Sequence, residues 1–134
     1  MMSSEMDELA LIEVSKLRPH EETTEGRVRQ IKKALEDTGI LWFPILVDKE
    51  SLTIIDGHHR TECFKRMGLR KIRARLVDYS NPGIKVETRR PEIEISKKIV
   101  VEKALAGEVF PHKTTRHKYP DQNKKINEPF ENFR

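Results

Sequence analysis

The turn Asp56-Gly57-His58-His59-Arg60 carries the densest group of side chains suited to chemistry in this 134-residue sequence. It follows an apolar run and precedes an amphipathic one, so a strand is predicted to end and a helix to begin here. Glycine lets the backbone turn tightly and approach a ligand, and the helix N-terminus offers free N–H groups to an anion. Arg60 and the two histidines add donors suited to phosphate oxygens, while Asp56 can bind Mg²⁺ or orient a histidine. The residues therefore favour a phosphate-holding turn.

The same turn is also consistent with a polar helix cap that has no chemical role, and the residues alone leave this alternative open. The spacing argues against a structural zinc site, because adjacent histidines on a helix cannot readily bind one ion and no Cys or His partner follows at ligand spacing. Cys63, the only cysteine, falls on an apolar helix face and is predicted to be a core residue.

Two further polar segments add candidate side chains. His20-Glu21-Glu22 places two carboxylates beside an Arg-Pro turn, at the entry to a predicted helix. Glu21 or Glu22 can accept a proton from a hydroxyl group, or both can simply complement the helix dipole. The other segment offers two hydroxyls, a guanidinium group and an imidazole that can grip a carboxylate or phosphate, although a solvated basic loop is the alternative. Its residues are Thr114, Thr115, Arg116 and His117.

Several strands and helices are expected to position these segments. Apolar residues at helical spacing and glycine stops indicate the helices, and alternating or continuous short apolar runs indicate the strands. Pro44 suggests an edge strand or a bulge, and Trp42 is expected in the core. The expected order is strand 9–17, helix 22–37, strand 41–48, strand 52–56, helix 58–67, strand 71–79, a short strand 84–88 and a helix from Ser96 to Gly107.

Composition limits the class of protein. Charged residues make up 36% of the chain, which suits a single domain with a modest core and is compatible with a thermophilic source. We expect one α+β domain over residues 1–119 and a polar, partly disordered tail over 120–134. No apolar run reaches the length of a membrane span and no signal peptide is recognisable, so a cytoplasmic protein without a membrane partner is expected.

The net charge of +4 suits a small anionic ligand at least as well as duplex DNA. A basic strip in the predicted strand 71–79 and just before it is most often a solvated face, but it can also contact nucleic acid. The strip consists of Arg70, Lys71, Arg73 and Arg75.

The strand ending in IIDGHHR, the helix after it and the segment GLRKIRARLV resemble the ParB/sulfiredoxin superfamily over roughly residues 9–78. The upstream segments VSKLRPHEET and WFPILVDKESL follow the same pattern. The resemblance implies a ParB/sulfiredoxin-like fold, in which a small mixed sheet packs with helices and a turn holds nucleotide phosphates. His58 stands where sulfiredoxins carry a catalytic cysteine, so sulfinic-acid repair is not expected.

Within the superfamily, DGHHR, the upstream HEE and the segment FPHKTTRH together resemble the free L-serine kinase branch. This resemblance implies transfer of a phosphoryl group from ATP or ADP to free L-serine, with Mg²⁺. Glu21 or Glu22 would be the base, with Glu21 favoured, and residues 114–117 would bind serine or stabilise charge. The donor phosphates and the metal would be held by Asp56, Gly57, His58, His59 and Arg60.

Two alternatives remain beside this kinase. One is a ParB-like module that binds or hydrolyses a nucleotide near DNA, with partition-like or nuclease activity. The other is a nucleotide-binding regulator that has lost catalysis. The oligomeric state is left open.

Overall fold

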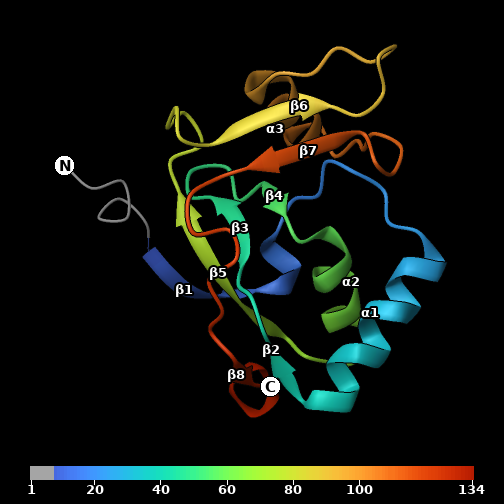
Figure 1. Ribbon diagram of the computed structural model, residues 1–134, viewed down its shortest axis with the longest axis vertical. Helices are drawn as coiled ribbons and strands as arrows, with labels where there is room; N and C mark the ends of the chain where they lie inside the picture. Colours follow the sequence, from blue (N-terminus) through green and yellow to red (C-terminus); the bar gives the residue numbers. More distant parts are fainter. Residues whose placement is uncertain (1–7) are drawn as a thin grey trace.

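A four-stranded mixed sheet lies at the centre of this computed structural model, which describes residues 8–134 (Figure 1). The strand order is β1-β5-β3-β4. β5 is antiparallel to β1 and parallel to β3, and β3 and β4 form the expected antiparallel hairpin. The strands are β1 (Glu8–Glu13), β3 (Ile45–Asp48), β4 (Ile54–Asp56) and β5 (Lys71–Val77). The predicted α+β class with a small mixed sheet is confirmed.

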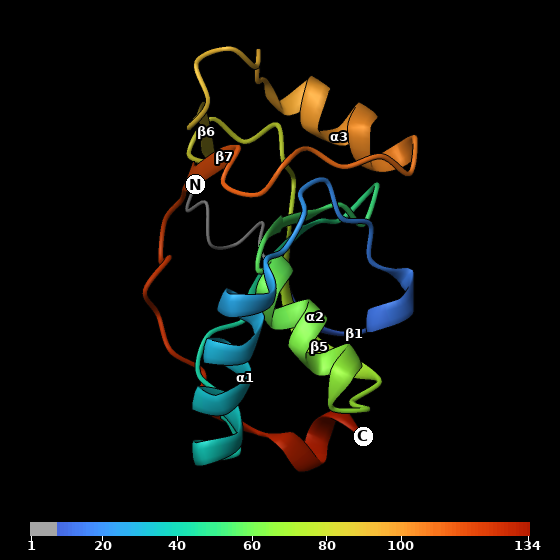
Figure 2. The same cartoon turned by 90° about the vertical axis from the view of Figure 1, so that its right-hand side faces the viewer.

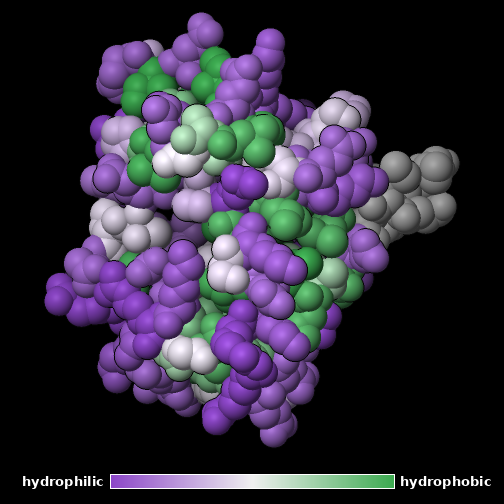
Figure 3. Space-filling model, turned by 180° about the vertical axis from the view of Figure 1, so that it is seen from behind, coloured by the Kyte–Doolittle hydropathy of each residue, from purple (hydrophilic) through white to green (hydrophobic). Residues whose placement is uncertain are grey.

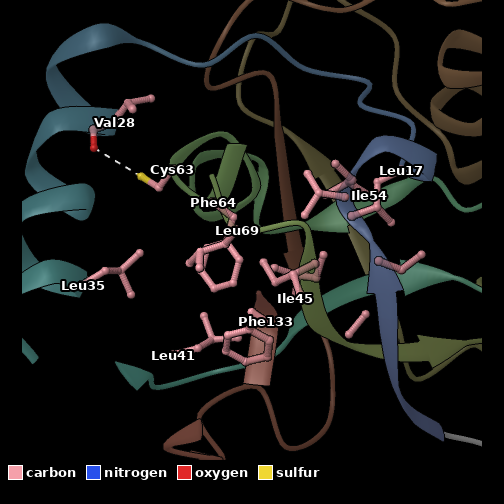
Figure 4. Packing of buried hydrophobic residues seen from close by; sticks show 14 residues of the cluster. Leu17, Val28, Leu35, Leu41, Ile45, Ile54, Cys63, Phe64, Leu69 and Phe133 are labelled. Atoms are coloured by element: carbon pink, nitrogen blue, oxygen red, sulfur yellow. Dashed lines mark hydrogen bonds between the residues drawn. The ribbon is translucent and has the colours of Figure 1, made fainter. Parts of the chain in front are cut away.

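Helices α1 (Glu25–Thr38) and α2 (His58–Arg66) pack side by side against one face of this sheet. The main core lies between them and the strands, with Ile45 and Phe64 fully buried (Figure 4). Cys63 is also fully buried, and its Sγ donates to the carbonyl oxygen of Val28 at 3.3 Å. The prediction that Cys63 is a core residue is confirmed.

The opposite face of the sheet is buried as well, because side chains alternate along β3. Ile45 and Val47 belong to the core beneath α1 and α2, whereas Leu46 packs with Val77 and Val100 on the other side. Val100 lies on α3 (Lys97–Leu105), whose predicted N-cap is confirmed because Ser96 Oγ accepts the N–H of Ile99 at 3.2 Å. Burial on both faces explains why β3 is a continuous apolar run.

A two-stranded ribbon lies above the central sheet and carries one of the candidate segments. β6 (Lys85–Thr88) pairs antiparallel with β7 (Thr115–Lys118). Figures 1 and 2 both place this ribbon and α3 in the upper part of the molecule, with α1 and α2 below. The segment expected as a basic loop is therefore mostly a strand.

Several local expectations near the sheet are wrong. The first strand ends at Glu13 and is followed by a 3₁₀ turn, η2 (Val14–Lys16), rather than continuing to residue 17. The expected strand 41–48 is interrupted at Pro44, which separates β2 (Ile40–Leu41) from β3 and so occupies no position in a ladder. β3 is an inner strand rather than an edge strand. Trp42, expected in the core, is 42% exposed.

The C-terminal segment is ordered, so the expectation that residues 120–134 are partly disordered is wrong. β8 (Glu128–Pro129) pairs with β2, and the 3₁₀ turn η3 (Phe130–Phe133) inserts Phe133 into the main core with no exposed surface. Arg73 binds Glu128 through two hydrogen bonds of 2.8 and 2.9 Å. Isolated apolar residues, a short strand pairing and the side chains of Arg73 and Arg75 attach this segment, which explains why its polar, aperiodic sequence suggested disorder.

The surface seen from behind is largely hydrophilic, with scattered hydrophobic patches (Figure 3). Within residues 8–134, no helix has the length and apolar character that crossing a membrane requires.

Candidate functional site

The turn before α2 has the geometry of an anion site. Gly57 has a φ of 114°, and a Cβ at this position would lie 2.3 Å from Cγ2 of Ile45, so only glycine fits without rearrangement. The first helical hydrogen bond of α2 runs from Thr61 N to Gly57 O, and no side chain caps the helix. The backbone N–H groups of residues 58–60 therefore remain available at the positive end of the helix.

These residues open onto a cleft of about 710 Å³ between the helical part of the molecule and the β6–β7 ribbon. Every candidate residue of the turn lines it, as do several residues of α1 and of the loop before β7. Among its charged side chains, basic ones outnumber acidic ones. The lining residues are Glu21, Thr24, Arg27, Gln30, Ile31, Ile55, Asp56, Gly57, His58, His59, Arg60, Arg89, His112, Lys113, Thr115, Arg116, His117 and Gln122.

The two adjacent glutamates occupy different environments. The carboxylate of Glu21 lines the cleft and accepts the backbone N–H groups of Lys113, Thr114 and Thr115 at 3.1, 3.3 and 2.9 Å. The Thr115 hydroxyl donates to the same carboxylate at 2.8 Å. Glu22 is exposed and does not line the cleft. The structure therefore distinguishes the two glutamates: the side chain of Glu21 lines the cleft, and that of Glu22 does not.

Both histidines of the turn are held as neutral rings. Nε2 of His58 accepts the backbone N–H of His20 at 3.1 Å, and Nε2 of His59 accepts that of Thr24 at 3.3 Å. An imidazole nitrogen that accepts an N–H carries no proton, so each neutral ring bears its proton on Nδ1. Burial lowers the pKa of His58 well below its ordinary value, and the nearby His20 and His117 add to that effect. Burial also lowers the pKa of His59.

Asp56 and Arg60 are partly engaged within the protein. Asp56 Oδ2 accepts the hydroxyl of Tyr119 at 2.6 Å and lies 3.6 Å from a terminal nitrogen of Arg60. The other terminal nitrogen of Arg60 donates to the carbonyl oxygens of Phe43 and Pro44, both at 2.9 Å. Arg60 thus braces the chain before β3 and also lines the cleft.

A metal at this site would depend mainly on Asp56. Within residues 8–134, no group of three or more His, Cys, Asp and Glu side chains is arranged to hold an ion. A single carboxylate fits Mg²⁺, because Mg²⁺ is commonly held by one or two carboxylates together with phosphate oxygens and water. The donor set is therefore compatible with Mg²⁺ that arrives with a nucleotide, and not with a metal held by the protein alone.

The four residues of the second candidate segment divide between the cleft and the interior. Thr115, Arg116 and His117 line the cleft. Thr114 is fully buried and donates its hydroxyl to the carbonyl oxygen of Pro111 at 2.6 Å, so it does not line the cleft. Arg116 is exposed and lies 3.7 Å from a carboxylate oxygen of Glu87.

His117 is a buried neutral histidine on β7 of the ribbon. Its Nε2 is 2.6 Å from the hydroxyl of Tyr79, and its ring centroid is 6.0 Å from that of His20. Burial, reinforced by His20, lowers the pKa of His117 to about 3. Burial raises the pKa of Tyr79. This pair is therefore uncharged at neutral pH.

Sequence reasoning missed several residues of the cleft. Those in α1 and just after β6 have isolated side chains that carry no motif, and those in the loop before β7 belong to the segment FPHKTTRH but were not singled out. The missed residues are Arg27, Gln30, Arg89, His112 and Lys113. His20 was noted only as part of its segment, although it is fully buried beneath the cleft.

Two of the four side chains of the basic strip, both on β5, are used within the chain. Arg73 is paired with Glu128, and Arg75 is buried and donates to the carbonyl oxygens of Pro120 and Asp121 at 2.7 and 2.9 Å. These two guanidinium groups fix the C-terminal segment to the sheet. The face expected as a possible nucleic-acid contact is therefore covered at these two positions.

Comparison with known proteins agrees with this fold. A sequence model described as the ParB N-terminal domain matches residues 2–86. An ATP-dependent L-serine kinase of Staphylothermus marinus is 34% identical over 90 residues, covering 64% of this chain and 36% of that protein. An ADP-dependent L-serine kinase of Thermococcus kodakarensis is 29% identical over 96 residues, covering 69% of this chain and 40% of that protein. The chain thus spans about two fifths of the length of the curated relatives it matches.

A solved structure of a free serine kinase in complex with AMP superposes with a TM-score of 0.85 at 19% identity, covering 94% of this chain and 93% of that chain. At that identity the likeness establishes the fold alone. Other structures of a free serine kinase contain mutants at one glutamate, in complex with AMP or ADP.

Proposed function

This chain belongs to the ParB N-terminal domain family, and we propose that it is a kinase that transfers a phosphoryl group from ATP or ADP to the hydroxyl of free L-serine. The relatives named as L-serine kinases, one ATP-dependent and one ADP-dependent, support this choice of donor and acceptor. One observation carries the proposal: the Glu21 carboxylate and the open N-terminus of α2 line the same cleft. Phosphoryl transfer to a hydroxyl needs these two elements together, a phosphate cradle and a nearby base.

The donor nucleotide is assigned to the turn before α2. The free N–H groups of residues 58–60 lie at the N-terminus of α2, which is the end of a helix where phosphate oxygens bind most favourably. The Nδ1–H groups of His58 and His59, together with Arg60, can supply further donors, since all three residues line the cleft. Neutral histidines suit this role, since they donate hydrogen bonds without requiring a buried positive charge.

Asp56 is assigned to Mg²⁺. When bound, Mg²⁺ would neutralise charge on the phosphate oxygens of the nucleotide. The hydrogen bond from Tyr119 and the ion pair with Arg60 orient the Asp56 carboxylate at the mouth of the cleft. Asp56 would then coordinate the ion in company with phosphate oxygens and water.

Glu21 is assigned as the general base. It would take the proton from the serine hydroxyl while the serine oxygen bonds to the terminal phosphorus and the bond from that phosphorus to the bridging oxygen breaks. Glu22 is exposed and outside the cleft, which supports Glu21 over its neighbour. The exposed Arg116 also lines the cleft, where its guanidinium group can receive the serine carboxylate.

The test is to incubate the purified chain with L-serine, Mg²⁺ and either ATP or ADP, and to detect O-phosphoserine by mass spectrometry. The proposal expects O-phosphoserine with at least one of the two nucleotides. Nucleotide binding without any phosphorylated product would instead support a regulator that has lost catalysis.

A further inference from the structure

His20 has no role in the phosphoryl transfer described above, yet it is fully buried directly behind Glu21. Its Nδ1 lies 2.8 Å from the carbonyl oxygen of Ile54, and its Nε2 lies 3.1 Å from Oγ1 of Thr115. The same Thr115 oxygen is 2.8 Å from Oε1 of Glu21. One hydroxyl therefore stands between the proposed base and a buried imidazole.

Only one proton is available for the two contacts that Thr115 Oγ1 makes with Glu21 and His20. A carbonyl oxygen only accepts, so Nδ1 of His20 must carry the proton that is donated to Ile54. In a neutral ring, Nε2 then carries none and can only accept from Thr115. An ionised Glu21 can likewise only accept. Both groups thus compete for the single hydroxyl proton of Thr115, and one of the two contacts stays unmade until a second proton arrives.

We infer that Glu21, Thr115 and His20 form one proton-sharing unit, in which Thr115 donates to Glu21 while Glu21 is ionised and turns to donate to His20 once Glu21 is protonated. A hydroxyl prefers a carboxylate to a neutral acceptor, because charge-assisted hydrogen bonds are stronger. Neutralising Glu21 removes that preference and releases the Thr115 proton to His20. His20 and Thr115 are positioning residues in this unit, because neither is assigned to bind the reacting atoms.

The catalytic effect of this unit rests on the proposed function, whereas the hydrogen bonds that form the unit do not. When Glu21 takes the proton of the acceptor hydroxyl, it loses the charge that favoured the bond from Thr115. The bond from Thr115 to His20 then forms and offsets part of that loss. The proton stays on Glu21 until product leaves, and no electron changes hands. Because the bond to His20 exists only after proton transfer begins, the His20 acceptor stabilises the transition state relative to a site that lacks it.

The surroundings keep His20 neutral at neutral pH. The titratable groups that face it are Glu21, His58 and His117, the two histidine rings lying at centroid distances of 4.5 and 6.0 Å. Burial lowers the pKa of His20, while the carboxylate of Glu21 and the bond to Ile54 oppose that effect. A neutral His20 is the form that can accept from Thr115.

Nitrogen NMR of the His20 ring, at neutral pH and without substrate, tests the unit independently of catalysis. Glu21→Gln imitates the protonated base, so the non-protonated Nε2 of His20 should gain a hydrogen bond and its resonance should move upfield. Glu22→Gln, with the same change of charge one residue away, should leave the resonance in place. In the Thr115→Val background, where no hydroxyl remains, adding Glu21→Gln should cause no movement.

The unit is disproved if Glu21→Gln leaves the His20 resonance unmoved, or if the same movement persists in the Thr115→Val background. Turnover supplies a second readout. Thr115→Val should lower kcat by roughly ten- to a hundredfold, by analogy with the loss of an outer-shell partner behind a metal ligand, because Glu21 loses the hydroxyl that holds its carboxylate; KM for nucleotide should be nearly unchanged. Thr115→Ser, which keeps the hydroxyl, should retain most of kcat.

An unchanged kcat in Thr115→Val would overturn the catalytic contribution of the unit. If the NMR coupling is present but no phosphoserine forms with either nucleotide, the proton-sharing unit stands and the proposed kinase function fails. The two conclusions can therefore be rejected separately.

Discussion

Glu21 and Thr115 are 94 residues apart in sequence, yet the Glu21 carboxylate accepts both the backbone N–H and the hydroxyl of Thr115, at 2.9 and 2.8 Å. This contact attaches the segment before α1 to the start of β7. It brings the HEE and KTTRH segments together at the cleft, where His20 N–H also donates to His58 of the phosphate-holding turn. The proposed site is thus assembled from three parts of the chain that are remote in sequence.

Gly57→Ala should destabilise the fold. The new Cβ would meet Ile45 Cγ2 at 2.3 Å and the backbone would stay in the left-handed region. Together these effects should cost about 2–5 kcal/mol in the free energy of unfolding, measured by urea denaturation. Gly26→Ala is the matched control, because its Cβ would meet nothing within 4 Å in α1 and should stabilise by up to about 1 kcal/mol. Equal stability of the two variants would show that the turn is not constrained as described.

Phe133→Ala should cost about 3–5 kcal/mol in the free energy of unfolding, since Phe133 is fully buried in the main core. Glu131→Ala, at an exposed position of the same 3₁₀ turn, should change it by less than about 0.5 kcal/mol. Thermal or urea unfolding of the two variants provides the comparison. A negligible effect of Phe133→Ala would show that Phe133 does not anchor the C-terminal segment, and would support the partly disordered tail expected from the sequence.

The free energy of unfolding should fall as pH decreases from about 6.5, partly because of His117. The pKa of His117 is about 3 in the folded protein, so between these pH values the unfolded chain binds a proton that the folded chain does not. The contribution of this one residue reaches at most about 1.4 kcal/mol per pH unit. Urea denaturation across this range should therefore give a shallower pH dependence for His117→Gln than for the wild type. Identical slopes would mean that His117 is not kept neutral by burial.

The sequence predicted the local parts of the site well. Gly57 followed by a helix is a local signal, because the turn, the helix start and the free N–H groups all depend on neighbouring residues. The environment of Glu21 was not predictable in the same way. Its hydrogen bonds come from residues 113–115, and nothing in the spacing of the sequence indicates that these segments meet.

The failures follow from tertiary contacts that override local patterns. Pro44 and Trp42 lie in a stretch that looks like one strand, but the chain breaks at the proline and leaves the tryptophan 42% exposed. The C-terminal segment lacks periodicity because single anchors hold it, among them Phe133 in the core and Glu128 on Arg73. Such anchors cannot be recognised before their partners are known.

The most direct test of the central claim compares O-phosphoserine formation by the wild type, Glu21→Gln and Glu22→Gln, with binding of ADP measured in parallel. We expect Glu21→Gln to bind ADP as the wild type does, while its kcat falls about 10²- to 10⁴-fold, the range for loss of a general base. Glu22→Gln should stay within a few-fold of the wild type, because its side chain lies outside the cleft. Full activity in Glu21→Gln, or no phosphoserine from the wild type with either nucleotide, would contradict the account.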